Sequence, residues 1–208
     1  MHEYLPQILA ALSIQTVGVL SPGPSVALIL GVAMGRGRFP ALMTALGVAC
    51  GSIVLATATV FGVTALFAQV AEMMTLIRLV GAGYLIWLAW KAFGKAMNPP
   101  QINATPVEAG SILRTGLSGF LLQVSNPKAI LFWLAIASIG GVGSAPPDVA
   151  ALFITGAFLN SFAGHGAYAL LLSAAPVRHA FGRARRWIEG ALGVFFLIAG
   201  LRLAMAGK

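Results

Sequence analysis

Residues 5–34 read LPQILAALSIQTVGVLSPGPSVALILGVAM, an apolar segment without a charged residue that is interrupted near its middle by Ser21-Pro22-Gly23-Pro24-Ser25. Proline lacks an N–H group and its ring clashes with the carbonyl four residues earlier, so a helix through this segment must bend or break. Carbonyl groups near residues 18–20 then lose their helical partners. A bilayer tolerates this only where protein or a water-filled cavity satisfies them. The stretch therefore predicts a broken membrane helix, with a simple proline kink as the alternative.

The composition of the whole chain also indicates a membrane protein. Of its 208 residues, 59% are hydrophobic and 9% are charged, whereas a soluble domain carries about 25% charged residues. The runs Ile53–Ala71 and Leu79–Trp90 contain no charged side chain, and about 20 apolar residues let a helix cross the bilayer. The apolar segments are 5–34, 41–68, 73–94, 112–139, 149–174 and 187–206. We expect an all-α integral membrane protein with six transmembrane helices, because the runs lack the alternation of a membrane β-barrel.

The chain divides into two halves of three segments each. Residues 97–110 form a polar, proline-containing linker between a first repeat of about 1–96 and a second of about 111–208, within one membrane domain of 1–208. The fourth segment carries Ser125-Asn126-Pro127-Lys128 where the first carries its prolines. Three crossings are an odd number, so the repeats would be inverted, with broken first and fourth helices. Interrupted segments at matching positions are typical of a transporter's binding site, and chance similarity of the short motifs is the alternative.

Basic residues are distributed unevenly between the two sides of the membrane. Nine of them fall in or beside the first, third and fifth loops, and three fall on the opposite side. The nine are Arg36, Arg38, Lys91, Lys95, Arg114, Arg178, Arg183, Arg185 and Arg186, and the three are Arg78, Arg202 and Lys208. This positive-inside bias places those loops in the cytoplasm and both termini outside. Anionic lipid headgroups are then the expected neighbours of the net charge of +8, and no nucleic-acid partner is expected.

Both proline breaks fall near the middle of the predicted membrane. Pro24 lies about ten residues from Met34, or about 15 Å of helix, and Lys128 lies a similar distance from Ile139. Each break starts a half-helix whose unpaired N–H groups and positive dipole end suit a carboxylate. The predicted substrate-binding residues are Pro22, Gly23, Pro24, Ser25, Asn126, Pro127, Lys128 and Asn160.

Lys128 is the charged residue at the predicted bilayer centre, where such a charge costs about 2.5–3.5 kcal/mol on insertion scales. The acidic residues fall in predicted loops or at segment ends, and they are Glu3, Glu72, Glu108, Asp148 and Glu189. A substrate carboxylate is then the expected partner of Lys128. A neutral lysine, or a lysine bonded to the freed backbone carbonyls, is the alternative.

His165 lies between Gly164 and Gly166 at mid-depth in the fifth segment. A histidine can carry a proton near neutral pH, so His165 and Lys128 are the predicted coupling residues. A neutral histidine bonded to a neighbouring helix is an equally open alternative.

Other chemistries lack the residues that they need. A soft metal requires thiolates or clustered imidazoles, and the chain has one cysteine, Cys50, so no metal site and no cofactor are expected. An intramembrane hydrolase that uses Ser125 or Ser161 would need a base and an orienting third group, and the chain has no GxSxG motif. We therefore predict no catalytic residue and no enzyme.

Several blocks carry a resemblance to a known family. They are Pro22-Gly23-Pro24, Arg36-Gly37-Arg38, Ala45-Leu46-Gly47 with Gly51, Gly81-Ala82-Gly83-Tyr84-Leu85 before Trp90-Lys91, Gly119-Phe120 before Asn126-Pro127-Lys128-Ala129, and Gly190 with Gly193. With these blocks the chain resembles, over most of its length, the lysine exporter and homoserine/threonine resistance (LysE/RhtB) family of amino-acid translocators.

The resemblance implies a six-helix exporter of small amino acids in the cytoplasmic membrane of a bacterium. It implies an antiporter driven by a proton gradient in preference to sodium, and it allows a homodimer. It carries a functional role onto Pro24, Asn126, Pro127 and Lys128. Ser52 stands where many members have an acid, and Ala41 replaces a frequent glycine. Without an acid at mid-depth, we expect a neutral cargo and not lysine or arginine; an exporter of another small solute or a metal ion is the alternative.

Overall fold

The computed structural model describes residues 4–67, 71–99, 110–137 and 145–205, and every regular element in these ranges is an α-helix. The helices are α1 (Leu5–Leu20), α2 (Pro24–Arg36), α3 (Arg38–Phe67), α4 (Ala71–Met97), α5 (Ile112–Ser125), α6 (Pro127–Ala137), α7 (Pro147–Leu171) and α8 (Ala175–Met205). The all-α prediction is confirmed for these residues. Most of the predicted linker 97–110 lies outside the described ranges, since 100–109 are not among them.

Each of the six predicted segments corresponds to one helix or one bent pair of helices. The first segment is α1 followed by α2, bent by 50°, and the fourth is α5 followed by α6, bent by 54°. The predicted breaks at the two proline motifs are thus confirmed. Among the described residues, α3, α7 and α8 are each long and apolar enough to cross a membrane, and counting each bent pair as one span raises that number to five.

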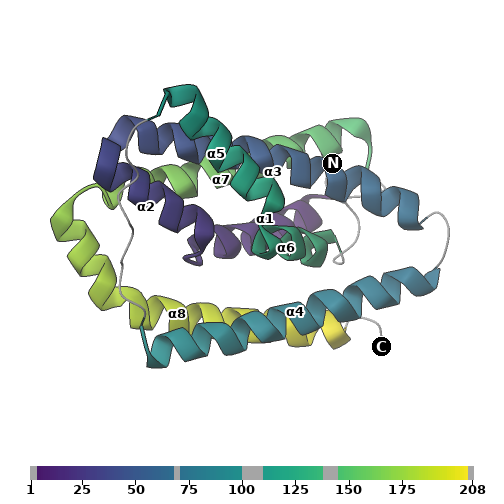
Figure 1. The fold of residues 1–208 in the computed structure, drawn as a ribbon. Helices are drawn as coiled ribbons and strands as arrows, with labels where there is room; N and C mark the ends of the chain where they lie inside the picture. Colours follow the sequence, from purple (N-terminus) through teal and green to yellow (C-terminus); the bar gives the residue numbers. More distant parts are fainter. Residues whose placement is uncertain (1–3, 68–70, 100–109, 138–144, 206–208) are drawn as a thin grey trace.

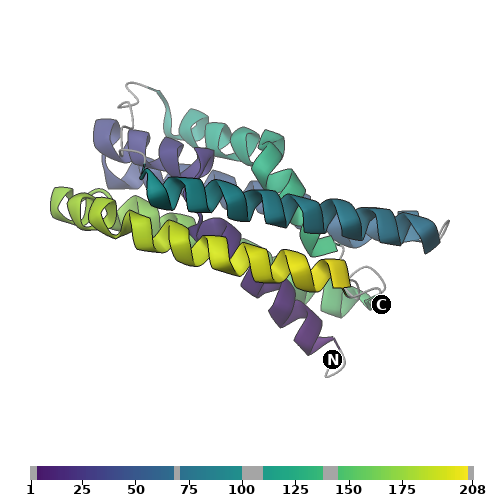
Figure 2. The same cartoon turned by 90° about the horizontal axis from the view of Figure 1, so that it is seen from below.

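The helices form a bundle and a separate two-helix layer. Figures 1 and 2 show α4 and α8 side by side and running in opposite directions, apart from α3, α5 and α7. The bundle is held by α3, which packs along both α5 and α7. The short helix α6 joins the two parts, because it contacts α4 and its Phe132 ring lies 5.6 Å from the Phe196 ring of α8.

The outer surface of this arrangement is apolar. Large side chains that point outward include Phe61 on α3, Trp90 on α4, Leu113 on α5 and Leu159 on α7, all of which are more than half exposed. A soluble protein rarely exposes so much apolar surface, and a lipid-facing one requires it. The surface agrees with the membrane class that the composition predicts.

One predicted boundary is wrong, and the error matters for function. The sixth segment was expected to begin at residue 187, but α8 begins at Ala175. The arginines at 178, 183, 185 and 186, expected in a loop, therefore lie on the first turns of α8. Glu189 was expected at the end of a segment. It lies instead near the middle of α8, where its side chain is fully buried.

Candidate functional site

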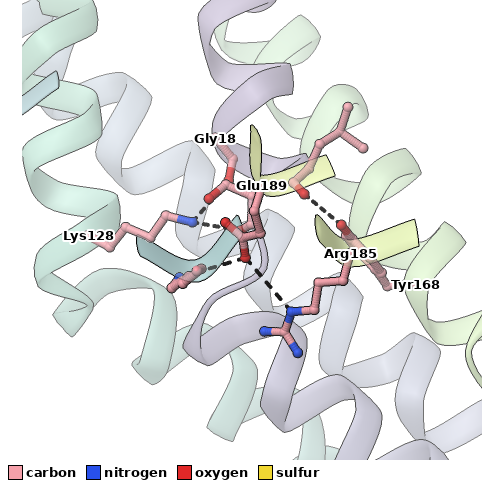
Figure 3. A network of polar contacts seen from close by, with 8 residues as sticks. Gly18, Lys128, Tyr168, Arg185 and Glu189 are labelled. Atoms are coloured by element: carbon pink, nitrogen blue, oxygen red, sulfur yellow. Dashed lines mark hydrogen bonds and ion pairs between the residues drawn. The ribbon is translucent and has the colours of Figure 1, made fainter. Parts of the chain in front are cut away.

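The break in the first span leaves backbone carbonyls that side chains of the other half satisfy. In a continuous helix the N–H groups of residues 22 and 24 would bond to the carbonyls of Gly18 and Leu20, but both positions are proline. The Lys128 ammonium donates to the Gly18 carbonyl at 3.4 Å and to the Ser21 carbonyl at 2.6 Å. The Tyr168 hydroxyl donates to the Leu20 carbonyl at 2.7 Å. Figure 3 shows the side chains of Lys128 and Tyr168 reaching the end of α1 from two sides.

These bonds give the Lys128 ammonium partners within the protein. The carbonyls freed by the break solvate it, so a substrate carboxylate is not needed to hold it in place. The ammonium also packs against Gly23, where a Cβ atom would lie 3.3 Å from Nζ. Glycine at this position lets the lysine lie directly against the broken backbone.

The two half-helices that follow the breaks start differently. Gly23 precedes α2, and no side chain caps that helix start in the described structure. Asn126 precedes α6, and its side-chain oxygen accepts a hydrogen bond from the N–H of Lys128 at 3.1 Å. The start of α2 therefore retains N–H groups for an anion, while one donor at the start of α6 is already used.

A cavity of about 50 Å³ lies between the two breaks. It brings together six predicted site residues, namely Gly23, Pro24, Ser25, Asn126, Lys128 and His165. Two polar residues that the sequence did not single out also line it, and they are Gln15 and Gln123. Ser52, which stands where many family members have an acid, lines it as well. A cavity of roughly 10–15 Å³ holds one water, so this one accommodates a few small polar groups. Its positive features are the Lys128 ammonium and the uncapped start of α2.

A line of hydrogen-bonded side chains crosses the wall of this cavity. The Ser25 hydroxyl donates to the Gln123 oxygen at 3.4 Å, and the Gln123 amide donates to the Ser52 hydroxyl at 3.1 Å. Ser52 then donates to Ser161 at 3.0 Å, and the Ser161 hydroxyl lies 3.3 Å from Nδ1 of His165. The network links four helices and connects the start of α2 to the histidine on α7.

The buried side chain of His165 faces this network. Its Nδ1 lies 2.9 Å from the backbone carbonyl of Ser161. A carbonyl only accepts hydrogen bonds, so Nδ1 carries the proton in this contact and Nε2 is the nitrogen left to exchange one. The histidine is thereby oriented by its own helix.

Three predicted site residues do not line the first cavity. Pro127 is exposed at the start of α6, and Pro22 lines a second cavity on the other side of the break. Asn160 bonds to the Leu12 carbonyl and to the Gln15 oxygen, at 3.3 and 3.0 Å, along the contact between α1 and α7. Asn160 therefore orients Gln15, which lines the cavity.

The second cavity, of about 170 Å³, shares Ser21, Gly23, Pro24 and Lys128 with the first. Its far wall contains Glu189. The prediction that every acid lies in a loop or at a segment end is therefore wrong for Glu189, because α8 extends further than its apolar run. A carboxylate therefore lines the same cavity as the Lys128 ammonium. Figure 3 shows both side chains from close by.

The site residues that the sequence analysis did not predict have only weak features in the sequence that mark them as part of a site. Gln15 and Gln123 are polar residues inside apolar segments, and such residues in membrane helices face protein or water. Tyr168 has no motif that marks it, because its partner at Leu20 is far away in the sequence. Glu189 would have been found by extending α8 to include its arginine-rich first turns.

Comparisons with known proteins agree on one family. A family model described as LysE type translocator matches residues 16–207. The chain is 29% identical over 199 residues to the threonine efflux protein of Escherichia coli (strain K12), covering 93% of this chain and 95% of that protein. It is 29% identical over 191 residues to the leucine efflux protein of Salmonella choleraesuis (strain SC-B67), covering 89% of each. No solved structure gives a significant match.

Proposed function

Because the chain belongs to the LysE-type translocator family, we propose that it exports neutral amino acids from the cytoplasm, with the cavity between the two breaks as the substrate site. One observation carries the proposal. The Lys128 ammonium and the uncapped start of α2 face the same small cavity. Both favour a carboxylate, which every amino acid carries.

The arrangement of the helices supports a six-span transporter built from inverted repeats. We propose α4 as the sixth span, because it is 27 residues long and lies antiparallel to α8 along its length. Contacts between the halves are reciprocal: α1 packs on α7 as α5 packs on α3, and α2 packs on α7 as α6 packs on α3. Such exchange is expected of two inverted repeats around a shared site.

The same proposal includes the setting of the protein. The positive-inside bias of the nine basic residues, four of which lie on the first turns of α8, favours an orientation with that side in the cytoplasm and both termini outside a bacterial cytoplasmic membrane. The cargo is a small amino acid, with Pro22, Pro24, Ser25, Asn126 and Pro127 shaping the broken backbone around it. A proton serves as the coupling ion, in antiport, and the exporter assembles as a homodimer.

We expect neutral amino acids to be carried faster than lysine or arginine. Among the described residues, the first cavity is lined by Lys128 and by no carboxylate. A cationic side chain about 4 Å from Lys128 would be repelled by about 4 kcal/mol at an effective dielectric constant of 20. The names of the threonine and leucine efflux relatives agree with a neutral cargo. Counterflow in proteoliposomes against a panel of labelled amino acids measures this preference.

The panel needs threonine, homoserine, leucine, lysine and arginine, together with liposomes that lack protein. Neutral amino acids exchanging at least about tenfold faster than the cationic ones is the expected result, since 1.4 kcal/mol corresponds to a tenfold ratio. Faster exchange of lysine or arginine would contradict the proposed cargo. Exchange of none of the five would contradict the proposed function.

His165 is proposed as the coupling residue, and we expect its replacement by alanine to flatten the pH dependence of export. The side chain lines the first cavity and ends the hydrogen-bonded line from Ser25. Removing the ring removes the one ionisable group in that line. The measurement is the rate of export between pH 5.5 and 8.5, at saturating substrate, in roughly half-unit steps.

His179 provides the matched control for this experiment. It lies exposed on α8, outside both cavities, so His179→Ala should keep the pH profile of the unmodified protein. An unchanged profile in His165→Ala would remove this histidine from the coupling scheme.

A further inference from the structure

The second cavity is chemically different from the first. It is bounded on one side by Lys128 and the broken backbone, and on another by Glu189 of α8. Lys91 and Lys95 of α4 also line it, and both belong to the basic residues that place this end of α4 at the cytoplasmic side. The cavity therefore lies between the cytoplasmic end of α4 and the break.

Glu189 contributes a carboxylate to the described wall of this cavity, and that carboxylate can accept further hydrogen bonds. The side chain is 1% exposed. Its Oε1 lies 3.9 Å from the Lys95 ammonium and 3.8 Å from Nε of Arg185. These are ion-pair distances, longer than a hydrogen bond. Neither carboxylate oxygen has a hydrogen-bond donor within the described part of the chain.

Buried carboxylates are rarely left in this condition. Most buried polar atoms in proteins have a hydrogen-bond partner, and an exception calls for a ligand, a water or a functional role. A purely structural ion pair would close to about 2.7–2.9 Å to gain charge-assisted hydrogen bonds. Lys95 is free to close this gap, since its side chain is 39% exposed.

We propose that the second cavity is a loading site for zwitterionic amino acids, in which Glu189 accepts the α-ammonium group. This inference rests on the proposed export of amino acids. The α-ammonium supplies three N–H donors, which suit two carboxylate oxygens without donors. The α-carboxylate then faces Lys128. Because Lys128 lines both cavities, the carboxylate stays next to the same ammonium when the substrate moves from the second cavity to the first.

The charges of this cavity also select the cargo. Among the described residues that line it, one acid, Glu189, faces three lysines, namely Lys91, Lys95 and Lys128. A zwitterion offers one group to each sign, whereas a substrate with a second cation adds repulsion. An analogue with a hydroxyl in place of the α-amino group offers the buried carboxylate one neutral donor in place of three charged N–H donors, and it binds more weakly.

The test compares an amino acid with its deaminated analogue. Binding of L-leucine and of 2-hydroxy-4-methylpentanoate to the purified protein in detergent is measured by calorimetry. Three proteins are compared: the unmodified chain, Glu189→Gln and the control Asp148→Asn, which removes an exposed carboxylate at the start of α7. Flux of labelled leucine and threonine is measured separately in proteoliposomes.

The expected result is binding of leucine at least tenfold tighter than the hydroxy acid in the unmodified protein and in Asp148→Asn. In Glu189→Gln that ratio should fall to about one, through weaker binding of leucine alone. Equal binding of the two probes to the unmodified protein overturns the proposal without any variant, even if Glu189→Gln fails to fold. A retained ratio in a folded Glu189→Gln overturns it as well. If the ratio behaves as expected but no amino acid is transported, the proposed function fails and the loading site stands.

Discussion

Replacing Lys128 with alanine is expected to remove most of the export activity while the protein still inserts into the membrane. The substitution removes the cation that lines both cavities and that the substrate carboxylate would meet. It also removes the donor to the carbonyls of Gly18 and Ser21. A hydrogen bond to a charged group contributes about 1.5–3 kcal/mol, so flux per folded molecule should fall by roughly 10- to 100-fold. Flux in proteoliposomes, divided by the amount of folded protein, measures the effect.

Two further variants separate binding from architecture. Lys128→Arg keeps the charge and the donors to the carbonyls, so it should fold normally and retain part of the flux. Arg183→Ala removes an exposed cation on α8 and should leave the flux unchanged. Flux in Lys128→Ala equal to that of the unmodified protein, at equal abundance, would show that the lysine does not take part in transport.

Replacing Gly47 with valine is expected to prevent the folding of the bundle. A Cβ atom at Gly47 would overlap the carbonyl oxygen of Gly116, and one at Gly119 would overlap the carbonyl of Thr44. The backbones of α3 and α5 are therefore in direct contact, and no side-chain rotation relieves an added group. Overpacking of this kind costs about 1–3 kcal/mol where side chains can adjust, and separating two helices exceeds that range.

Gly62→Val is the matched control, since it makes the same change on the same helix. No heavy atom lies within 4 Å of a Cβ built at Gly62, and the position is exposed. Folded yield by size-exclusion chromatography and thermal unfolding in detergent should distinguish the two variants clearly. Similar stability of Gly47→Val and Gly62→Val would mean that the α3–α5 contact is not required for the fold.

Much of the site could be predicted because proline leaves a local signature. The positions of Pro22, Pro24 and Pro127 predict where helices end, and the carbonyls freed near Gly18 and Leu20 follow from helix geometry alone. Lys128 was found because its charge contrasts with its apolar segment. These predictions need no knowledge of which helices are neighbours.

The rest could not be predicted, because it depends on long-range packing. Ser25, Ser52 and Gln123 become one hydrogen-bonded line only after α2, α3 and α5 pack together. Glu189 was misplaced for a different reason. The first turns of α8 are rich in arginine, so hydropathy alone begins the segment too late, at 187, and leaves the acid at a predicted boundary. Arginine has a high helix propensity, and in the first turns of α8 this propensity is a better guide to the start of the helix than hydropathy.

The bonds that satisfy the α1 carbonyls have a consequence for biogenesis. The Gly18 and Leu20 carbonyls are present as soon as the first span leaves the ribosome, but their donors come 110 and 148 residues later in the chain. At a synthesis rate of about 5–20 residues per second, that interval lasts roughly 5 to 30 seconds. During this time the carbonyls require water or the insertion machinery as a substitute partner. The first half of the protein therefore cannot reach its final position in the lipid before the second half is translated.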